Sequence, residues 1–178
     1  MVLGDSLSAG FGIDTQSSWV SLLKTRLSEK NYPYEVINAS ISGDTSSGGL
    51  NRIQRTLPKN KPPGILILEL GANDGLRGLS LKEMKKNLSA IVKFALDKKY
   101  RVLIIGMRLP PNYGLSFANM FSSTFNELAQ EHDIAYLPFL FEGIASNSDY
   151  FLSDQLHPNE KAQPLLLNNV WLHLKPLL

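Results

Sequence analysis

Cysteine is absent from this 178-residue chain, and histidine occurs only three times. The lack of cysteine excludes disulfide bonds, thiolate nucleophiles and cysteine-based metal sites, but it is compatible with any cellular compartment. The small number of histidines leaves few candidates for a general base, which is most often a histidine. Apolar runs of about 20 residues, the length that crosses a bilayer as a helix, are also missing. We therefore expect no stable membrane insertion.

A strong charge of one sign is lacking as well. The formal net charge is +2, and the lysines and arginines are scattered apart from short runs such as 59–61 and 98–99. Nucleic-acid binding requires a basic face, so no nucleic-acid partner is expected. The hydrophobic share of 43% and the charged share of 19% are those of an ordinary soluble globular protein. The length predicts a single domain over residues 1–178.

The hydrophobic pattern alternates between short apolar runs, typical of buried parallel strands, and amphipathic segments at helical spacing. Strands are expected up to Gly4 and over 34–38, 65–70, 101–106 and 134–137. Helices are expected over 17–30, 46–57, 80–98 and 117–128, and from about Pro158 toward the C-terminus. This alternation predicts an α/β fold of three layers, in which helices cover both faces of a five-stranded parallel sheet.

The expected strand order places a binding site at one edge of the sheet. A flavodoxin-like order, 2-1-3-4-5, puts the ligand-binding point between the first and third strands. These two strands lead into Ser6 and Asn73, respectively. The fold and the polar residues therefore predict a site at the same place.

Ser6 is the candidate nucleophile. It follows the first strand in Gly4-Asp5-Ser6-Leu7-Ser8, so it presents a hydroxyl at the carboxyl edge of the sheet. A serine hydroxyl becomes a nucleophile when a base takes its proton and a third group orients that base. The search for the base is short because only three histidines are present.

His157 is the candidate base. Pro158 pushes the preceding residue into an extended conformation and suits the first position of a helix. Asp154, three residues before the histidine, is expected to accept a hydrogen bond from the ring and to fix its tautomer. Taken alone, this Asp-x-x-His-Pro pattern is equally compatible with a capping arrangement. His132 is expected to be exposed on the surface, and His173 to be a surface or packing residue.

Acyl transfer also requires hydrogen-bond donors where negative charge develops. The candidates are the backbone N–H groups of Ser6 and Gly43 and the side-chain amide of Asn73. Asp5, Asp44 and Asp74 are interpreted mainly as turn and cap carboxylates, and Glu69 as a buried hydrogen-bonding residue. His157 has no second histidine at ligand spacing, so no metal site is expected.

An alternative is a non-catalytic flavodoxin-like module that binds a phosphate or a nucleotide through the loop 6–12. No P-loop lysine follows a glycine there, and no G-x-G-x-x-G opens a helix after a strand. The loop is also poor in basic residues. These features disfavour the alternative.

The chain resembles the SGNH (GDSL) hydrolases through four blocks. These are Gly4-Asp5-Ser6-Leu7-Ser8, Gly43, Gly71-Ala72-Asn73-Asp74 and Asp154-Gln155-Leu156-His157. Four further stretches are similar to bacterial multifunctional thioesterase/lysophospholipase/arylesterase proteins. They are 38–46, Asn73-Asp74-Gly75-Leu76-Arg77-Gly78, Arg108-Leu109-Pro110-Pro111-Asn112-Tyr113-Gly114 and His157-Pro158-Asn159. The chain departs from many relatives at Ala72, where glycine is frequent, and at Gln155-Leu156, where Gly-Ile or similar is common.

The resemblance implies a serine esterase and thioesterase that needs no metal or organic cofactor. Ser6, His157 and Asp154 would form the catalytic triad, and Ser6, Gly43 and Asn73 the oxyanion hole. Acyl chains would lie between the loops 75–79 and 109–115, with Gly75, Leu76, Leu109 and Pro110 binding substrate. The implied substrates are acyl or aryl esters, acyl-CoA thioesters and lysophospholipids.

The resemblance also suggests a periplasmic or secreted protein. Because the first motif begins almost at Met1, we expect no signal peptide within this chain, and a first strand this short would suit a trimmed or mature form. A cytoplasmic location stays open. Nothing in the sequence demands more than a monomer.

Overall fold

The computed structural model describes residues 1–58 and 64–178. Within these residues, four strands form one parallel sheet in the order β1-β2-β3-β4. The strands are β1 (Val2–Gly4), β2 (Ile65–Glu69), β3 (Arg101–Ile105) and β4 (Ala135–Leu137). Every residue of β2 is buried, as expected for a parallel strand that is covered on both faces.

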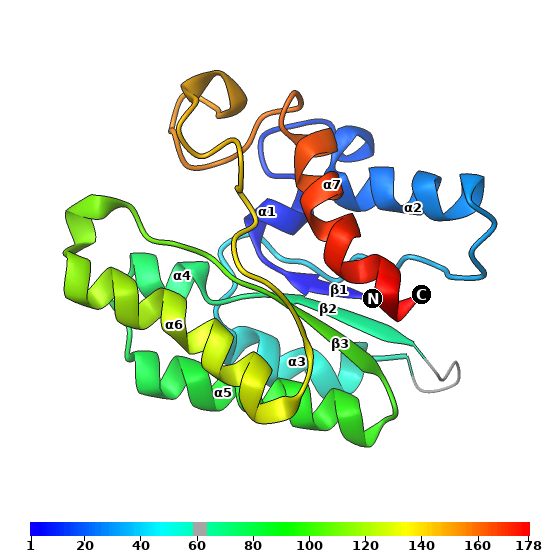
Figure 1. Cartoon of the computed structure of the whole chain (residues 1–178), viewed down its shortest axis with the longest axis horizontal. Coiled ribbons are helices and arrows are strands. Elements are labelled where there is room, and N and C mark those ends of the chain that lie inside the picture. The colour runs from blue at the N-terminus through cyan, green and yellow to red at the C-terminus, as the bar shows by residue number, and fades with distance from the viewer. Residues whose placement is uncertain (59–63) are drawn as a thin grey trace.

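Helices cover both faces of this sheet (Figure 1). The α-helices of the described residues are α1 (Ser6–Ala9), α2 (Trp19–Glu29), α3 (Ser46–Thr56), α4 (Ala72–Leu76), α5 (Leu81–Asp97), α6 (Leu115–His132) and α7 (Gln163–Leu174). The short 3₁₀ helices are η1 (Thr15–Ser17), η2 (Pro111–Tyr113), η3 (Ser148–Tyr150) and η4 (Lys175–Leu177). In Figure 1, α2 and α7 lie on one side of the sheet, and α3, α5 and α6 lie on the other. The three-layer α/β prediction is confirmed.

The strand predicted over 34–38 does not form, so the sheet has four strands instead of five. The segment does lie beside β1, on the side that the order 2-1-3-4-5 requires. Val2 donates its N–H to the carbonyl of Ile37 and accepts from the N–H of Ala39, each at 2.8 Å. Because β1 has only three residues, few backbone groups point toward this neighbour, and the pairing is reduced to an isolated bridge between Val2 and Asn38.

One hydrophobic cluster joins the sheet to both helical layers. Trp19 and Leu23 on α2, and Leu88 and Ile91 on α5, are almost completely buried, as their helical spacing predicts. The side chain of Ser80 accepts from the N–H of Glu83 at the start of α5, as the capping pattern predicts. This packing fixes the carboxyl ends of β1 and β2, where α1 and α4 begin.

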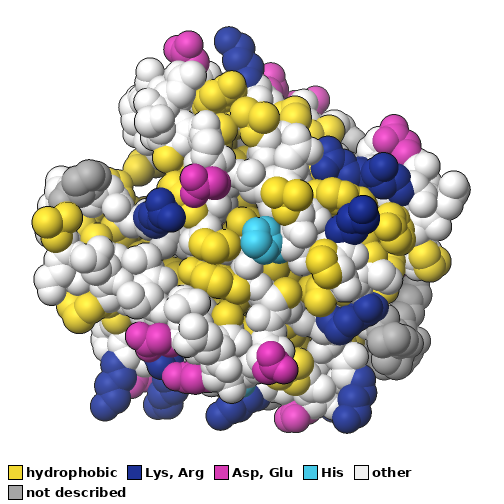
Figure 2. Space-filling view, viewed as in Figure 1, with side chains coloured by type: hydrophobic (Ala, Val, Ile, Leu, Met, Phe, Trp, Pro, Cys, Tyr) yellow, Lys and Arg dark blue, Asp and Glu magenta, His cyan; other side chains and the backbone are white. Residues whose placement is uncertain are grey.

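No helix in the described part of the chain is long and apolar enough to cross a membrane. On the face shown in Figure 2, basic and acidic side chains are mixed along the lower edge, a few basic side chains lie near one another at the upper right, and hydrophobic side chains lie between the charged ones. On that face the positive charges do not gather into one surface. This agrees with the scattered charge of the sequence.

Candidate active site

Ser6 is placed by a helix start. It is the first residue of α1, and the side chain of Asp5 caps this helix by accepting from the N–H of Leu7 at 3.0 Å. The sequence pattern predicts only a turn here, because a four-residue helix is too short to show a helical period. The backbone N–H of Ser6 lies in the first turn, where a helix offers it no internal acceptor. Both the hydroxyl and the N–H are therefore held at the carboxyl end of β1.

His157 is placed by a tight loop. Asp154 accepts at Oδ1 from the N–H groups of Leu156 and His157, at 2.9 and 3.0 Å, which closes a turn around the carboxylate. The carbonyl of His157 accepts from the N–H of Leu152 at 2.8 Å. These bonds hold the histidine above α1.

The prediction that the last helix begins near Pro158 is wrong. Pro158 pairs with Phe151 in an antiparallel bridge, and α7 begins only at Gln163. Asn159 stabilises this arrangement by donating its side-chain amide to the carbonyls of Asp149 and Phe151. The proline therefore holds His157 through a bridge, and the helix itself starts five residues later.

Three candidate residues form one hydrogen-bonded chain. Nε2 of His157 lies 2.9 Å from Oγ of Ser6, and Nδ1 lies 2.6 Å from Oδ2 of Asp154. The ring of Phe11 lies against the imidazole, with a centroid distance of 4.5 Å. The structure thus brings Ser6 together with Asp154 and with His157, which lies 151 positions further along the sequence.

The charge of Asp154 suits a group that orients a base. Partial desolvation raises the pKa of Asp154. The hydrogen bonds from the N–H and ring of His157 and from the N–H of Leu156 lower it, and together they outweigh the desolvation, so that the pKa falls to about 2. The carboxylate is therefore ionised throughout the neutral range. An ionised carboxylate favours the proton on Nδ1 and leaves Nε2 free to accept from the serine.

The other candidate donors lie at the same edge of the sheet. Asn73 belongs to α4, and its Nδ2 donates to Oδ2 of Asp5 at 3.0 Å. Gly43 has a φ of +79°, a left-handed conformation that favours glycine. Its N–H makes no hydrogen bond to any residue in the described part of the chain.

A cavity of about 640 Å³ opens beside Ser6 and His157. Leu76, Leu109 and Pro110 line it, as predicted for the substrate-binding residues. Gly75 lies behind this wall: a Cβ there would come within 2.6 Å of Phe121 and 2.9 Å of Leu109. The glycine therefore allows α4 to pack closely against its neighbours and does not itself line the cavity.

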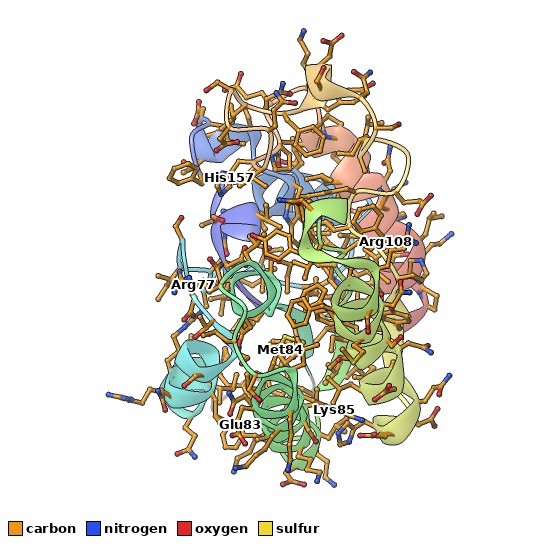
Figure 3. The ribbon with its side chains drawn as sticks, turned by 90° about the vertical axis from the view of Figure 1, so that its left-hand side faces the viewer. Arg77, Glu83, Met84, Lys85, Arg108 and His157 are labelled. Carbon is orange, nitrogen blue, oxygen red and sulfur yellow. The ribbon has the colours of Figure 1, made fainter. Side chains whose placement is uncertain are left out.

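Much of the apolar wall was not predicted from the sequence. The cavity is also lined by Met107, Phe139, Phe141, Ala145 and Phe151, and by the charged Arg108. The available signal was a run of aromatic residues directly after the last strand, at the carboxyl edge of the sheet. Figure 3 looks onto this edge, with His157 and Arg77 on its left and Arg108 on its right.

A buried carboxyl pair lies beneath the serine. Glu69, at the end of β2, accepts from Oγ of Ser8 at 2.7 Å and from the N–H of Asp5 at 3.3 Å. Burial and repulsion from Asp5 raise the pKa of Glu69 well above its usual range. Burial also raises the pKa of Asp5 to about 6, against the opposing hydrogen bonds from Leu7 and Asn73. Both carboxyl groups therefore hold a proton to higher pH than they would in an unfolded chain.

The raised pKa of Glu69 predicts a specific pH dependence of stability. A carboxyl group whose pKa is higher in the folded protein binds more protons when folded, so its contribution to the free energy of unfolding falls as pH rises above its unfolded value of about 4.5. Glu69→Gln is expected to remove this decrease in the free energy of unfolding, because glutamine does not titrate. Urea unfolding at pH 5 and pH 8 should show the variant gaining stability relative to wild type at the higher pH. An equal pH dependence in both proteins would contradict the raised pKa of Glu69.

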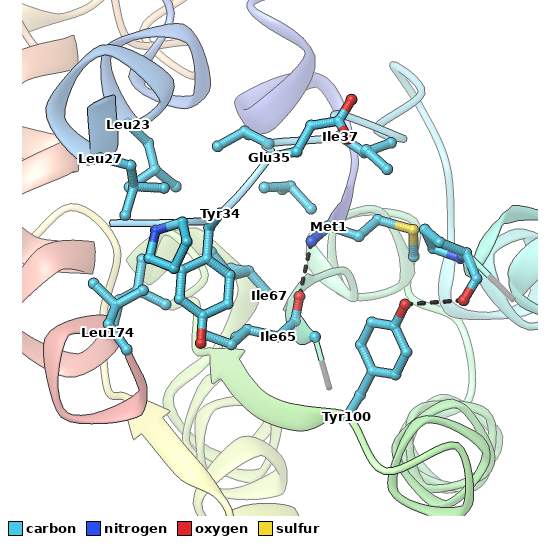
Figure 4. A pocket seen from close by; sticks show the side chains of 16 residues that line it. Met1, Leu23, Leu27, Tyr34, Glu35, Ile37, Ile65, Ile67, Tyr100 and Leu174 are labelled. Atoms are coloured by element: carbon cyan, nitrogen blue, oxygen red, sulfur yellow. Dashed lines mark hydrogen bonds between the residues drawn. The ribbon is translucent and has the colours of Figure 1, made fainter. Parts of the chain in front are cut away.

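A second cavity, of about 440 Å³, lies at the opposite edge of the sheet (Figure 4). There the Met1 amino group donates to the carbonyl of Ile65, and the Tyr100 hydroxyl donates to the carbonyl of Pro58. Its described lining includes none of the candidate site residues. Among residues 1–58 and 64–178, no group of three or more histidine, aspartate or glutamate side chains could hold a metal ion.

The comparisons with known proteins show the family. A model of the GDSL-like lipase/acylhydrolase family matches residues 2–164. The chain is 44% identical over 178 residues to esterase TesA of Pseudomonas aeruginosa, covering 100% of this chain and 88% of that protein. It is 37% identical over 177 residues to thioesterase 1/protease 1/lysophospholipase L1 of Escherichia coli (strain K12), and the match covers 99% of this chain and 83% of that protein.

A solved structure of an esterase shares the fold. The crystal structure of the psychrotrophic esterase EstA from Pseudoalteromonas sp., inhibited by monoethylphosphonate, matches with a TM-score of 0.92. The sequence identity is 38%, and the match covers 99% of this chain and 96% of that one. The chain therefore belongs to the GDSL-like lipase/acylhydrolase family and is a hydrolase that acts on ester bonds.

Proposed function

We propose that Ser6 is the nucleophile of this hydrolase, His157 its general base and Asp154 the group that orients the base. The observation that carries the proposal is the pair of hydrogen bonds at 2.9 and 2.6 Å that joins the three side chains. Nε2 of His157 takes the proton of Ser6 as Oγ attacks the acyl carbonyl. The protonated ring then gives this proton to the departing alkoxide or thiolate.

Hydrolysis of the acyl-enzyme uses the same ring in reverse order. His157 takes a proton from water, the hydroxide attacks the acyl carbon, and the proton returns to Oγ of Ser6 as the acid leaves. The side chains of His157 and Asp154 are 22% and 39% exposed, so water reaches the base directly. The open site suits a hydrolase because the second acceptor of the acyl group is water.

The proposed oxyanion hole consists of the N–H groups of Ser6 and Gly43 and the side-chain amide of Asn73. Among the residues that the structure describes, none accepts a hydrogen bond from the N–H of Ser6 or Gly43, so no acceptor there would have to be displaced. The amide nitrogen of Asn73 carries two hydrogens, and the bond to Asp5 uses only one. The second hydrogen is available for the oxyanion.

The proposed substrates are short- to medium-chain acyl or aryl esters, acyl-CoA thioesters and lysophospholipids. The cavity beside Ser6 has the size of a small-molecule site and is lined by Leu76, Leu109, Pro110 and aromatic side chains. Such a wall suits an acyl or aryl group. Membership of an ester hydrolase family sets aside the alternative of a non-catalytic phosphate-binding module.

A single hydrolase domain over 1–178, a monomeric state and a periplasmic or secreted location complete the proposal. The one hydrophobic cluster that joins all layers supports the single domain. The location and the monomeric state rest on the resemblance and the sequence.

The experiment is intact-mass analysis after treatment with a fluorophosphonate. This probe phosphonylates a serine whose base and oxyanion hole are assembled. We expect one adduct on the wild type and none on Ser6→Ala, because the other serines lack an aligned base within an oxyanion hole. The variant removes only the hydroxyl at a half-buried position, so circular dichroism should show an unchanged fold.

Ser89→Ala is the matched control. Oγ of Ser89 lies 2.8 Å from Nε2 of His132, a serine–histidine pair of similar length outside the cavity. This variant should be labelled like the wild type. An adduct that persists on Ser6→Ala, or that disappears with Ser89, would overturn the assignment of the nucleophile.

A further inference from the structure

Arg77 joins the two segments that carry the proposed side-chain and loop oxyanion donors. Arg77 follows α4 directly. Its Nη2 donates to the carbonyl of Gly43 at 2.9 Å and to Oδ1 of Asn73 at 3.3 Å. Figure 3 shows Arg77 below His157 at the same edge of the sheet. One guanidinium therefore contacts both Gly43 and Asn73.

The contacts of Asn73 fix which end of its amide is the donor. Oδ1 faces the positive guanidinium of Arg77, and Nδ2 faces the carboxyl group of Asp5. A flipped amide would place its oxygen against the carboxyl group of Asp5 and its NH₂ group against the guanidinium. Two acceptors would then face each other, as would two donors, and neither contact would be a hydrogen bond. Arg77 and Asp5 together hold the NH₂ group toward Asp5, the residue next to Ser6.

The contact with Gly43 fixes the second segment. Gly43 is exposed and lies in a turn at positive φ, where a flexible backbone would lose the orientation of its N–H. The hydrogen bond from Arg77 holds the carbonyl of this residue, and Nη2 lies only 3.5 Å from the position that a Cβ would occupy. The turn is thereby tied to α4.

We infer that Arg77 is a positioning residue for the oxyanion hole, which holds Gly43 and Asn73 in the geometry that the transition state needs. The inference rests on the proposed function. Within the described part of the chain, Arg77 makes no hydrogen bond or ion pair with the nucleophile or the base, and it acts through the two donors. A rigid donor set stabilises the oxyanion without reorganising during the reaction, which is the physical basis of the effect.

The test compares Arg77→Gln with wild type on an uncharged p-nitrophenyl ester. We expect kcat to fall about 10- to 100-fold, because misplacing donors by a fraction of an ångström to about 1 Å has costs of this size. KM should stay within about two-fold. The melting temperature should change by less than about 2 °C, since the side chain is exposed.

Two further variants sharpen the test. Arg77→Lys should recover only part of the lost kcat, because an ammonium group lacks the planar fork that reaches both acceptors. Arg55→Gln is the matched control: Arg55 is exposed on α3 and contacts the carbonyl of Asn51 in its own helix. It should have wild-type kinetics.

Each outcome separates this inference from the proposed function. If Ser6 is labelled by the fluorophosphonate but Arg77→Gln keeps the wild-type kcat, the positioning role is wrong and the proposed function stands. If Arg77→Gln raises KM for anionic acyl-CoA and leaves the neutral ester unaffected, Arg77 binds substrate directly and the positioning role is again wrong. If Ser6 is not labelled in the wild type, both proposals fail.

Discussion

Replacing His157 by alanine is expected to lower kcat/KM for an ester by about 10⁴- to 10⁶-fold, the loss seen when a serine hydrolase loses its base. The reason is the 2.9 Å contact between Nε2 and Oγ of Ser6, which provides the proton transfer that makes the hydroxyl a nucleophile. The measurement is steady-state hydrolysis of a p-nitrophenyl ester, with the fluorophosphonate labelling rate as a second readout. Both rates should fall together because both report the nucleophilicity of Ser6.

A double variant tests whether Asp154 acts only through His157. Asp154→Ala alone is expected to cost on the order of 10⁴-fold. In the background of His157→Ala, the same change should cost almost nothing more, since the carboxylate has no ring left to orient. Additive losses would contradict the proposed roles.

His132→Ala is the control for this series. His132 is half-buried at the end of α6 and hydrogen-bonds to Ser89 at 2.8 Å, whereas the sequence predicted an exposed surface histidine. The variant removes a histidine–serine hydrogen bond between two residues that do not line the cavity. Turnover should stay within about two-fold of wild type, as expected for a residue that takes no part in the reaction.

The sequence predicted the strands and helices that have a clear hydrophobic period. The buried run at 65–70 and the amphipathic run at 80–98 appear as β2 and α5 with nearly the expected ends. The short helices α1 and α4 were not predicted, because four or five residues cannot display a period of 3.6. Helix α1 carries Ser6 and helix α4 carries Asn73, so the two elements that the sequence did not predict lie at the site.

The positions of the site residues depend on contacts that no local pattern contains. The sequence indicated His157 through Asp154 and Pro158, but it assigned the proline to a helix start. The bridge between Phe151 and Pro158, and the amide of Asn159 that supports it, join residues on both sides of the loop. Long-range contacts of this kind depend on the tertiary fold, and the spacing of residues does not reveal them.

The same limit applies to Arg77 and to the aromatic wall of the cavity. Arg77 contacts Gly43 across 34 positions of sequence, and Phe139 reaches the cavity through the path of the chain after β4. Their residue types gave no signal by themselves: an arginine after a short helix is usually exposed, and phenylalanines usually belong to the core. Only the arrangement in space brings them to the site.

Replacing Asn73 by alanine is expected to lower kcat by about 100- to 1000-fold, the usual cost of removing one oxyanion donor. KM should change by less than about three-fold, because the ground-state carbonyl carries little of the charge that the amide stabilises. The measurement is kcat and KM on one neutral ester and one acyl-CoA thioester, with equal losses expected for both since they share the tetrahedral oxyanion. Asn51→Ala, at an exposed position of α3, is the control and should leave both constants unchanged.

The contact between Asn73 and Asp5 gives this prediction a second readout. Without the amide, Asp5 loses one of the hydrogen bonds that oppose the effect of burial, so its pKa should rise further above about 6. The stability of Asn73→Ala relative to wild type should therefore decrease as pH rises through this range, because the folded variant holds the proton of Asp5 to higher pH than wild type does. A loss of kcat without any change in this pH dependence would mean that Asn73 does not contact Asp5 in solution. An unchanged kcat would remove Asn73 from the oxyanion hole.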